Sequence, residues 1–455
     1  MKITRRKLFA GASSLAFAGM IYNLNGESFA KEQKIYGYGP LKKDPHKILD
    51  LPEGFSYRVI SSLGDKMDDG FLVPDRADGM GCIALDDDRV ALIRNHEINL
   101  KNQDDDAAKI LSPLLKEAYD HTDENIPHAG GTTTIIYDLS TGKRTKEFYS
   151  LIGTLQNCAG GITPWGSWLS CEENVTKAGE NSQLDHGWIF EVPATQEKLK
   201  KPFPLKAMGR FNHEAAAVDP KTGIVYLTED RPNSLFYRFI PNEYGKLHLG
   251  GKLQALAIME YGKGLDTRNW QSIDFKPQSW RNVKWIDLND IESPKDDLRI
   301  RGYKEGAATF ARGEGIHWGD NELYFCCTSG GKNKLGQVMR YQPSKFEGTT
   351  DENNVPGKLQ LFFESQDPND MNYGDNIVVT PFDHLLICED QYTDIVNNYI
   401  RGLTPEGQPY PFAKLVVQTE PAGCCFSPDG KTMFVNVYRP TMTLAITGPW
   451  NDFRV

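Results

Sequence analysis

The sequence predicts an all-β fold, a six-bladed β-propeller with long inserted loops. The first observation is composition, because 42 glycines, 26 prolines, 19 tyrosines and 22 phenylalanines suit a large, turn-rich β protein better than a helical bundle. The second is a hairpin pattern that occurs six times along the chain. Six such hairpins, separated by stretches with short strands of their own, indicate blades arranged around a channel. The pattern leaves open an ordinary β-sandwich with several Asp-Gly turns.

Each repeat contains an apolar run, a turn with Asp, Gly or Pro, a second apolar run, and then polar residues. The repeats span residues 81–97, 158–174, 214–230, 314–329, 376–390 and 423–436. Their turns, in the same order, are Asp86–Asp88, Pro164–Gly166, Asp219–Gly223, Gly319–Asn321, Pro381–Asp383 and Ser427–Gly430. Apolar runs joined by such turns are typical of β-hairpins. The long stretches 98–130 and 241–305 are expected to form a lid or a flank.

The N-terminus, residues 1–30, predicts a twin-arginine signal peptide. Arg5 and Arg6 precede an apolar run of small residues, and Ser28 and Ala30 supply the small side chains that a signal peptidase requires. The apolar run is shorter than the roughly 20 residues of a membrane-spanning helix, so no stable membrane span is expected. The expected location is therefore periplasmic or extracellular, with the twin-arginine export machinery as a transient partner.

The remaining chain, residues 31–455, is expected to form one closed domain. Its charge argues against nucleic-acid partners, since the net charge of the chain is −10. The chain has eight cysteines, and several of them, such as Cys326 and Cys388, lie in or at the end of apolar runs. Free cysteine at such places commonly acts as a small buried hydrophobic residue. The sequence contains no Cys-x-x-Cys pair, which argues against a zinc ribbon.

Acidic residues at matching positions of the repeats predict a metal site on the propeller axis. The innermost strands of a propeller lie beside the axis, so residues at their ends converge on one face. Before the first runs stand Cys158, Glu214, Glu314 and Asp375, and after the second runs stand Glu97, Glu172, Glu173, Glu229, Asp230, Glu389 and Asp390. Like charges in a desolvated pocket need cations to stay ionised. Oxygen ligands suit calcium, and a thiolate among them indicates a transition metal such as iron.

Arg312 adds a group that binds phosphate. It lies two residues before Glu314, so along an extended segment both side chains face the same side. The planar guanidinium matches the oxygens of a phosphate group, and a metal cluster beside it suits hydrolysis of phosphate esters. The sequence therefore favours phosphate-ester small molecules as substrates.

These residues resemble the PhoX family of bacterial alkaline phosphatases. The resemblance rests on Asn157–Gly161, Thr163–Gly166, Cys171–Asn174, His213–Ala215, Arg312–Glu314, Asp375–Asn376 and Phe426–Gly430. It implies an exported phosphatase that hydrolyses phosphate monoesters, built as a six-bladed propeller with a mixed iron and calcium centre. The same resemblance implies that the enzyme leaves the cytoplasm by the twin-arginine route.

The resemblance also implies roles for single residues. The expected metal ligands are Glu172, Glu173, Glu214, Glu314, Asp375 and Glu389. Arg312 is expected to contact the substrate phosphate. The iron-binding thiolate is Cys158 or Cys171, and the repeat alignment favours Cys158 because it takes the position of Glu214 and Glu314.

Two other functions remain open at this stage. One is a calcium-dependent lactonase or esterase, because propellers with axial carboxylates also host that chemistry and a fold does not fix a function. The other is a non-catalytic ligand-binding propeller with structural calcium. Neither has much need of a metal-binding thiolate or of Arg312, so these two residues favour the phosphatase.

Overall fold

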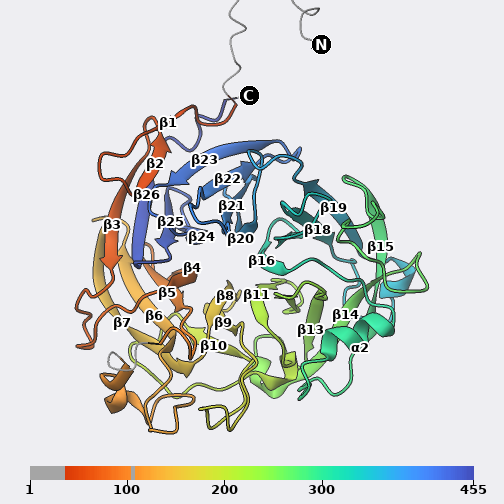
Figure 1. Cartoon of the computed structure of the whole chain (residues 1–455), viewed down its shortest axis with the longest axis horizontal. Helices are drawn as coiled ribbons and strands as arrows, with labels where there is room; N and C mark the ends of the chain where they lie inside the picture. Colours follow the sequence, from red (N-terminus) through yellow and green to blue (C-terminus); the bar gives the residue numbers. More distant parts are fainter. Residues whose placement is uncertain (1–35, 104–107, 455) are drawn as a thin grey trace, which may run out of the picture.

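The chain folds into β-sheets arranged around a central axis. The structure is a computed structural model that describes residues 36–103 and 108–454. The predicted signal peptide, residues 1–30, lies outside the described residues. Figure 1 shows the sheets as a ring, and the inner ends of the strands surround the middle of the molecule. This propeller-like arrangement, and not two facing sheets, is the predicted fold class.

Five sheets make up the ring. The first contains β4 (Ala77–Ala84), β5 (Arg89–His96), β6 (Gly130–Asp138) and β7 (Lys143–Thr154), and the second β8 (Asn157–Ile162), β9 (Ser167–Glu172) and β10 (Ile189–Pro193). The third has the order β11 (His213–Val218), β12 (Val225–Glu229), β13 (Tyr237–Pro241), β14 (Gly251–Ile258), β15 (Trp280–Asp287), β19 (Lys358–Glu364), β18 (Gln337–Gln342), β17 (Leu323–Cys327) and β16 (Gly313–Trp318).

The remaining two sheets contain the first and the last of the described strands. One has the order β1 (Leu41–Lys42), β2 (Leu49–Pro52), β23 (Pro409–Leu415), β22 (Tyr399–Leu403), β21 (Leu385–Glu389) and β20 (Gly374–Val379). The other has the order β24 (Pro421–Phe426), β25 (Thr432–Val437), β26 (Met442–Thr447) and β3 (Ser56–Ser62). Because β3 pairs with β26, an early strand completes the last sheet and closes the ring.

All six predicted hairpins are present as antiparallel pairs, namely β4-β5, β8-β9, β11-β12, β16-β17, β20-β21 and β24-β25. Their first strands form a closed inner ring, in which β4 contacts β8, β8 contacts β11, β11 contacts β16, β16 contacts β20, β20 contacts β24, and β24 returns to β4. Residues that begin these six strands are therefore brought together by the fold, although they are far apart in sequence.

The stretch 241–305 is a flank and not a lid. It contributes β14 and β15. Because β15 pairs with both β14 and β19, it joins the strands β11–β14 to the strands β16–β19 in the nine-stranded sheet. It also carries α2 (Leu298–Lys304), which lies at the outer edge of the ring in Figure 1. Short 3₁₀ turns occur at Ser112–Leu114, Lys206–Met208, Leu247–Leu249 and Glu352–Asn354.

Apolar side chains fill the space between successive sheets. Within the nine-stranded sheet, a cluster also packs Tyr226 of β12 and Phe236, which precedes β13, against Phe325 of β17, with the rings of Phe236 and Phe325 stacked 4.4 Å apart. All eight cysteines are buried and unpaired. For several of them, including Cys326 and Cys388, the position in an apolar run predicts this burial. Within the part of the chain that is described, no helix is long and apolar enough to cross a membrane.

Candidate metal centre

The inner strands share one local geometry that directs side chains toward the axis. In each hairpin the first residue of the first strand pairs with the last residue of the second strand, as Ala77 pairs with His96 and Asn157 with Glu172. The register then shifts, which is the mark of a β-bulge. In five of the hairpins a residue at the shift is of a type that can bind metals, namely Asp78, Cys158, Glu214, Glu314 and Asp375.

Crowding near the axis explains why glycine or alanine follows four of these five positions, Asp375 being the exception. A Cβ atom placed on Gly79 would lie 2.5 Å from Cα of Ala159, and one on Gly315 would lie 2.7 Å from Cα of Asn376. Real Cβ atoms do not approach backbone atoms so closely. The neighbouring inner strands therefore touch directly after these bulged residues, and the bulged residue itself has room for a long side chain. We call the place of the bulged residue in each first strand its ring position.

A second set of residues comes from the ends of the second strands. The residues that directly follow those strands are Glu97, Glu173, Asp230, Thr328, Asp390 and Tyr438. Several of them meet the first set, since ligand atoms of Glu97, Cys158 and Glu173 lie within 4.8 Å of one another. The same limit holds for Glu214, Glu314 and Asp375.

The structure thus brings together five of the metal ligands expected from the sequence, namely Cys158, Glu173, Glu214, Glu314 and Asp375. Cys158 links the two groups, because its Sγ lies 3.2 Å from Oε1 of Glu214 and 3.5 Å from Oδ2 of Asp78. A third group, Asp375, Asp390 and Glu420, continues the cluster through the shared Asp375.

Glu172 and Glu389 do not join this cluster. Side chains alternate across a strand, so each of these residues faces the opposite way from Glu173 and Asp390, which follow them. Glu172 accepts hydrogen bonds from the backbone N–H groups of Leu155, Gly187 and Trp188, at 2.9–3.1 Å.

Glu389 is occupied in the same manner. It accepts from the N–H groups of Asn372 and Tyr399 at 2.8 and 2.9 Å, and from Nε of Arg401 at 3.0 Å. Both carboxylates therefore hold neighbouring backbone segments by hydrogen bonds, and neither of them points to the axis.

Arg312 lies beside the cluster, as expected, but it is held by protein carboxylates. Its Nε and Nη2 donate to the two oxygens of Asp230, each at 2.7 Å, and Nη2 also donates to Oε1 of Glu314 at 2.9 Å. Tyr392 covers the guanidinium, with its ring centroid 5.3 Å from Cζ. These contacts leave little rotational freedom to the guanidinium.

The electrostatics of the cluster favour bound cations. Burial, together with repulsion from neighbouring carboxylates, raises the pKa of Asp78, Glu173, Glu214, Glu314 and Glu420. Burial and the charge of Asp390 raise the pKa of Asp375 to about 8. Oδ1 of Asp78 and Oε2 of Glu214 are buried without a hydrogen-bond partner among the described residues. Unpaired buried oxygens beside a thiol form a donor set that fits metal ions.

Four members of the cluster were not among the ligands expected from the sequence, namely Asp78, Glu97, Asp390 and Glu420. The repeats place Glu97 and Asp390 after the second apolar runs without making them ligands, whereas Asp78 and Glu420 were not singled out. Asp78 takes the ring position of the first hairpin, and the pair Asp78-Gly79 repeats the acidic-small pattern of Glu314-Gly315. The first repeat begins at Gly81, and a start three residues earlier would have identified Asp78 as the counterpart of Glu314. Glu420 carries no such signal, because it lies just before β24.

The fold and this cluster define an all-β, propeller-like protein whose inner strands carry a centre of metal-ligand residue types. The model of a family described as alkaline phosphatase PhoX matches residues 36–441. The chain belongs to this family and is a phosphatase, which confirms the resemblance found in the sequence and decides against the lactonase and the non-catalytic propeller.

Comparison with solved structures supports the fold. The structure of Pseudomonas fluorescens PhoX in complex with vanadate, a transition state analogue, matches with a TM-score of 0.67 and 18% identity, over 91% of this chain and 98% of that chain. A gluconolactonase from Xanthomonas campestris matches with a TM-score of only 0.38 and 10% identity, over 82% of this chain and 98% of that one. A comparison with curated proteins finds no match.

Proposed function

We propose that the protein hydrolyses phosphate monoesters outside the cytoplasm with an iron and calcium centre on the axis of a six-bladed propeller. The observation that carries the proposal is the meeting of one thiol, Cys158, with carboxylates from different hairpins beside Arg312. The closed ring of six first strands supports six blades, since β15 alone joins two of them into the nine-stranded sheet.

The proposed ligands are Asp78, Glu97, Cys158, Glu173, Glu214, Glu314, Asp375, Asp390 and Glu420. The group that contains the thiol suits iron, and the all-oxygen group of Asp375, Asp390 and Glu420 suits calcium. Bound cations would act there as Lewis acids that offset the negative charge of the substrate phosphate. We leave Glu172 and Glu389 out of the centre because each faces the opposite side of its strand from Glu173 or Asp390.

Arg312 is the residue that we propose to bind the substrate phosphate. Its Nη1 makes no side-chain hydrogen bond within the described residues, so this nitrogen can donate to a phosphate oxygen while Asp230 holds the other side of the fork. A preoriented guanidinium costs no reorganisation when charge develops on the phosphoryl oxygens. The vanadate complex of the Pseudomonas fluorescens relative supports a phosphoryl site in this family.

The first test is hydrolysis of a chromogenic phosphate monoester before and after exhaustive chelation. We expect the chelated protein to fall to near the background rate and to melt at a lower temperature, because ligands that bind only the native state stabilise it. Readdition of iron and calcium should restore both properties. A chelated protein with unchanged activity and melting temperature would rule out a metal-dependent enzyme.

The same comparison has an expected pH dependence. The pKa of Asp375 is raised to about 8 in the metal-free fold, above its ordinary value of about 4. The folded, metal-free protein thus binds a proton that the unfolded chain releases, so its free energy of unfolding should fall as pH rises from about 4 to about 8. Bound cations replace these protons, and the metal-loaded protein should not show this loss.

Export by the twin-arginine route is the remaining part of the proposal, and it rests on the sequence of residues 1–30. Replacement of both Arg5 and Arg6 by lysine should leave uncleaved precursor in the cytoplasm, because the export receptor reads paired guanidinium groups. Lys2→Arg, which keeps the pair, is the matched control. Cell fractionation that finds the double variant exported normally would refute this route.

A further inference from the structure

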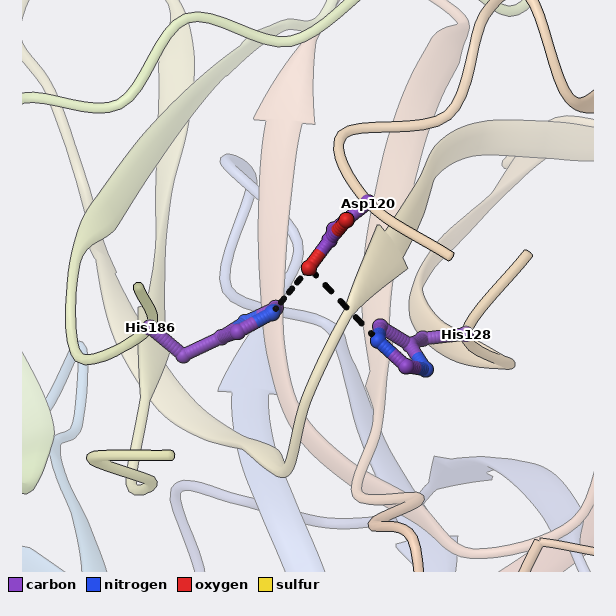
Figure 2. Close-up of side chains that lie close together, drawn as sticks. All are labelled: Asp120, His128 and His186. Atoms are coloured by element: carbon purple, nitrogen blue, oxygen red, sulfur yellow. Dashed lines mark hydrogen bonds and ion pairs between the residues drawn. The ribbon is translucent and has the colours of Figure 1, made fainter. Parts of the chain in front are cut away.

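A second group of metal-ligand side chains lies apart from the axial cluster. Asp120, His128 and His186 converge in Figure 2, with the carboxylate of Asp120 between the two imidazoles. Asp120 and His128 belong to the insertion between β5 and β6, and His186 belongs to the insertion between β9 and β10. All three side chains are at most 1% exposed, so the group is enclosed.

The distances within this group suit a small tetrahedral ion. Oδ2 of Asp120 lies 3.2 Å from Nε2 of His186 and 3.7 Å from Nε2 of His128. Ligands at ordinary zinc distances in a tetrahedral shell lie about 3.3 Å from one another. Ser182 stands where the three meet, since its Oγ lies 2.6 Å from Oδ2 of Asp120 and 3.0 Å from each Nε2.

A second observation, independent of this convergence, also indicates a metal. Nδ1 of His186 lies 2.6 Å from Oε1 of Glu172, so the carboxylate fixes the ring on the side away from Asp120. A carboxylate that orients the outer nitrogen of a ligating histidine is the usual arrangement around protein-bound zinc. This contact gives Glu172 a role of its own, next to Glu173 in the chain but on the other side of the strand.

Further contacts hold the ligands in place. The backbone N–H groups of Gln183 and Leu184 donate to Oδ2 of Asp120 at 3.0 and 2.9 Å.

We propose that Asp120, His128 and His186 bind a divalent transition-metal ion of the zinc type, with Ser182 at the fourth position. Two imidazole nitrogens and one carboxylate favour zinc over calcium, which takes oxygen ligands. The ion joins two insertions that have little regular secondary structure of their own, and its binding free energy would add to the stability of the folded protein. Through Glu172 it also fixes the chain directly before Glu173 of the axial centre.

The competing explanation is a proton-shared network without metal. Burial acts to lower the pKa of His186, yet Glu172 and Asp120 raise it to about 9, so in the absence of an ion this histidine holds both carboxylates as a cation. Tyr119 and Gln183 also connect the two insertions by hydrogen bonds to Asp185 and Asp123. The experiment must therefore detect the ion itself.

Crystals of the wild-type mature protein, purified without chelator and equilibrated with stoichiometric zinc, should show an anomalous peak between the three side chains at the zinc absorption edge. No peak there, with the side chains in hydrogen-bonding contact, would overturn the proposal. This measurement does not depend on the folding of any variant.

A zinc titration of variants gives the second measurement. His128→Gln should bind one zinc ion fewer per chain than the wild type. Zinc about 100-fold above its dissociation constant should raise the melting temperature of the wild type by about 3 °C more than that of His128→Gln. His121→Gln is the matched control, because His121 lies in the same insertion and its ring hydrogen-bonds the backbone oxygen of its neighbour Thr122. Equal zinc content in the wild type and His128→Gln would also overturn the proposal. Phosphatase activity is not a readout, so the result is independent of the axial centre.

Discussion

Replacement of Arg312 by lysine is expected to lower phosphatase turnover by about 100-fold, the scale on which removal of one preoriented donor to a transition-state oxygen slows an enzyme. Lysine keeps the positive charge but lacks the planar set of N–H donors that a guanidinium group has. It can contact Asp230 or the substrate phosphate, whereas the guanidinium bonds both oxygens of Asp230 and keeps Nη1 for the substrate. Metal content should stay unchanged, because Arg312 itself ligates no ion.

The control for this variant is Arg340→Lys. Arg340 also bonds a carboxylate, that of Glu322, and also lies over aromatic rings, but it belongs to β18. The substitution Arg340→Lys should leave phosphatase turnover unaltered and lower the free energy of unfolding by at most about 1 kcal/mol, because partly exposed ion pairs contribute no more than that. Equal turnover of Arg312→Lys and wild type at saturating substrate would show that the guanidinium does not bind the transferred phosphoryl group.

The fold was predictable because its signal repeats. Six turns rich in Asp, Gly and Pro separate apolar runs, and each of them became the turn of an antiparallel pair, as Asp86–Asp88 between β4 and β5 shows. The sheet partners of the outer strands left no comparable signal. In particular, β15 pairs with β19 across an interval of more than 70 residues, and nothing local in the sequence encodes such a pairing.

The candidate site was predictable to within one residue, and one residue matters in a strand. The pairs Glu172-Glu173 and Glu389-Asp390 each place two acids at the end of a second strand, and only the second of each pair joins the axial cluster. Period-two alternation separates their directions. The sequence shows both acids but not the last residue of the strand, so it cannot say which one faces the axis.

Glu420 marks a different limit. In the sixth hairpin the ring position holds Ala422, and the acid comes instead from the residue before β24. A repeat argument finds only residues that obey the repeat. Ala422 supplies no ligand, and Glu420, which lies outside the repeat pattern, forms the third group with Asp375 and Asp390.

The sharpest expectation concerns the two cysteines near the start of the second sheet. Cys158 lies 3.2 Å from Glu214 at the junction of two groups of the axial cluster, whereas Cys171 lies in an apolar cluster with Leu169 and Ile189. Burial raises the pKa of both thiols in the metal-free protein, but Cys158 lies among the carboxylates of the proposed metal centre, where a bound cation would stabilise its thiolate.

We therefore expect Cys158→Ser to remove or shift the visible thiolate-to-iron absorption band of the purified protein and to depress hydrolysis strongly. A hard hydroxyl, usually protonated, replaces a soft thiolate as ligand. Cys171→Ser should keep the band and most of the activity and lose about 1–3 kcal/mol of stability, because its hydroxyl is buried among apolar side chains. Visible spectra and thermal melts of the two variants check both statements. A band that survives in Cys158→Ser and disappears in Cys171→Ser would reverse the assignment, and it would place the thiolate ligand on the second strand of the hairpin instead of the first.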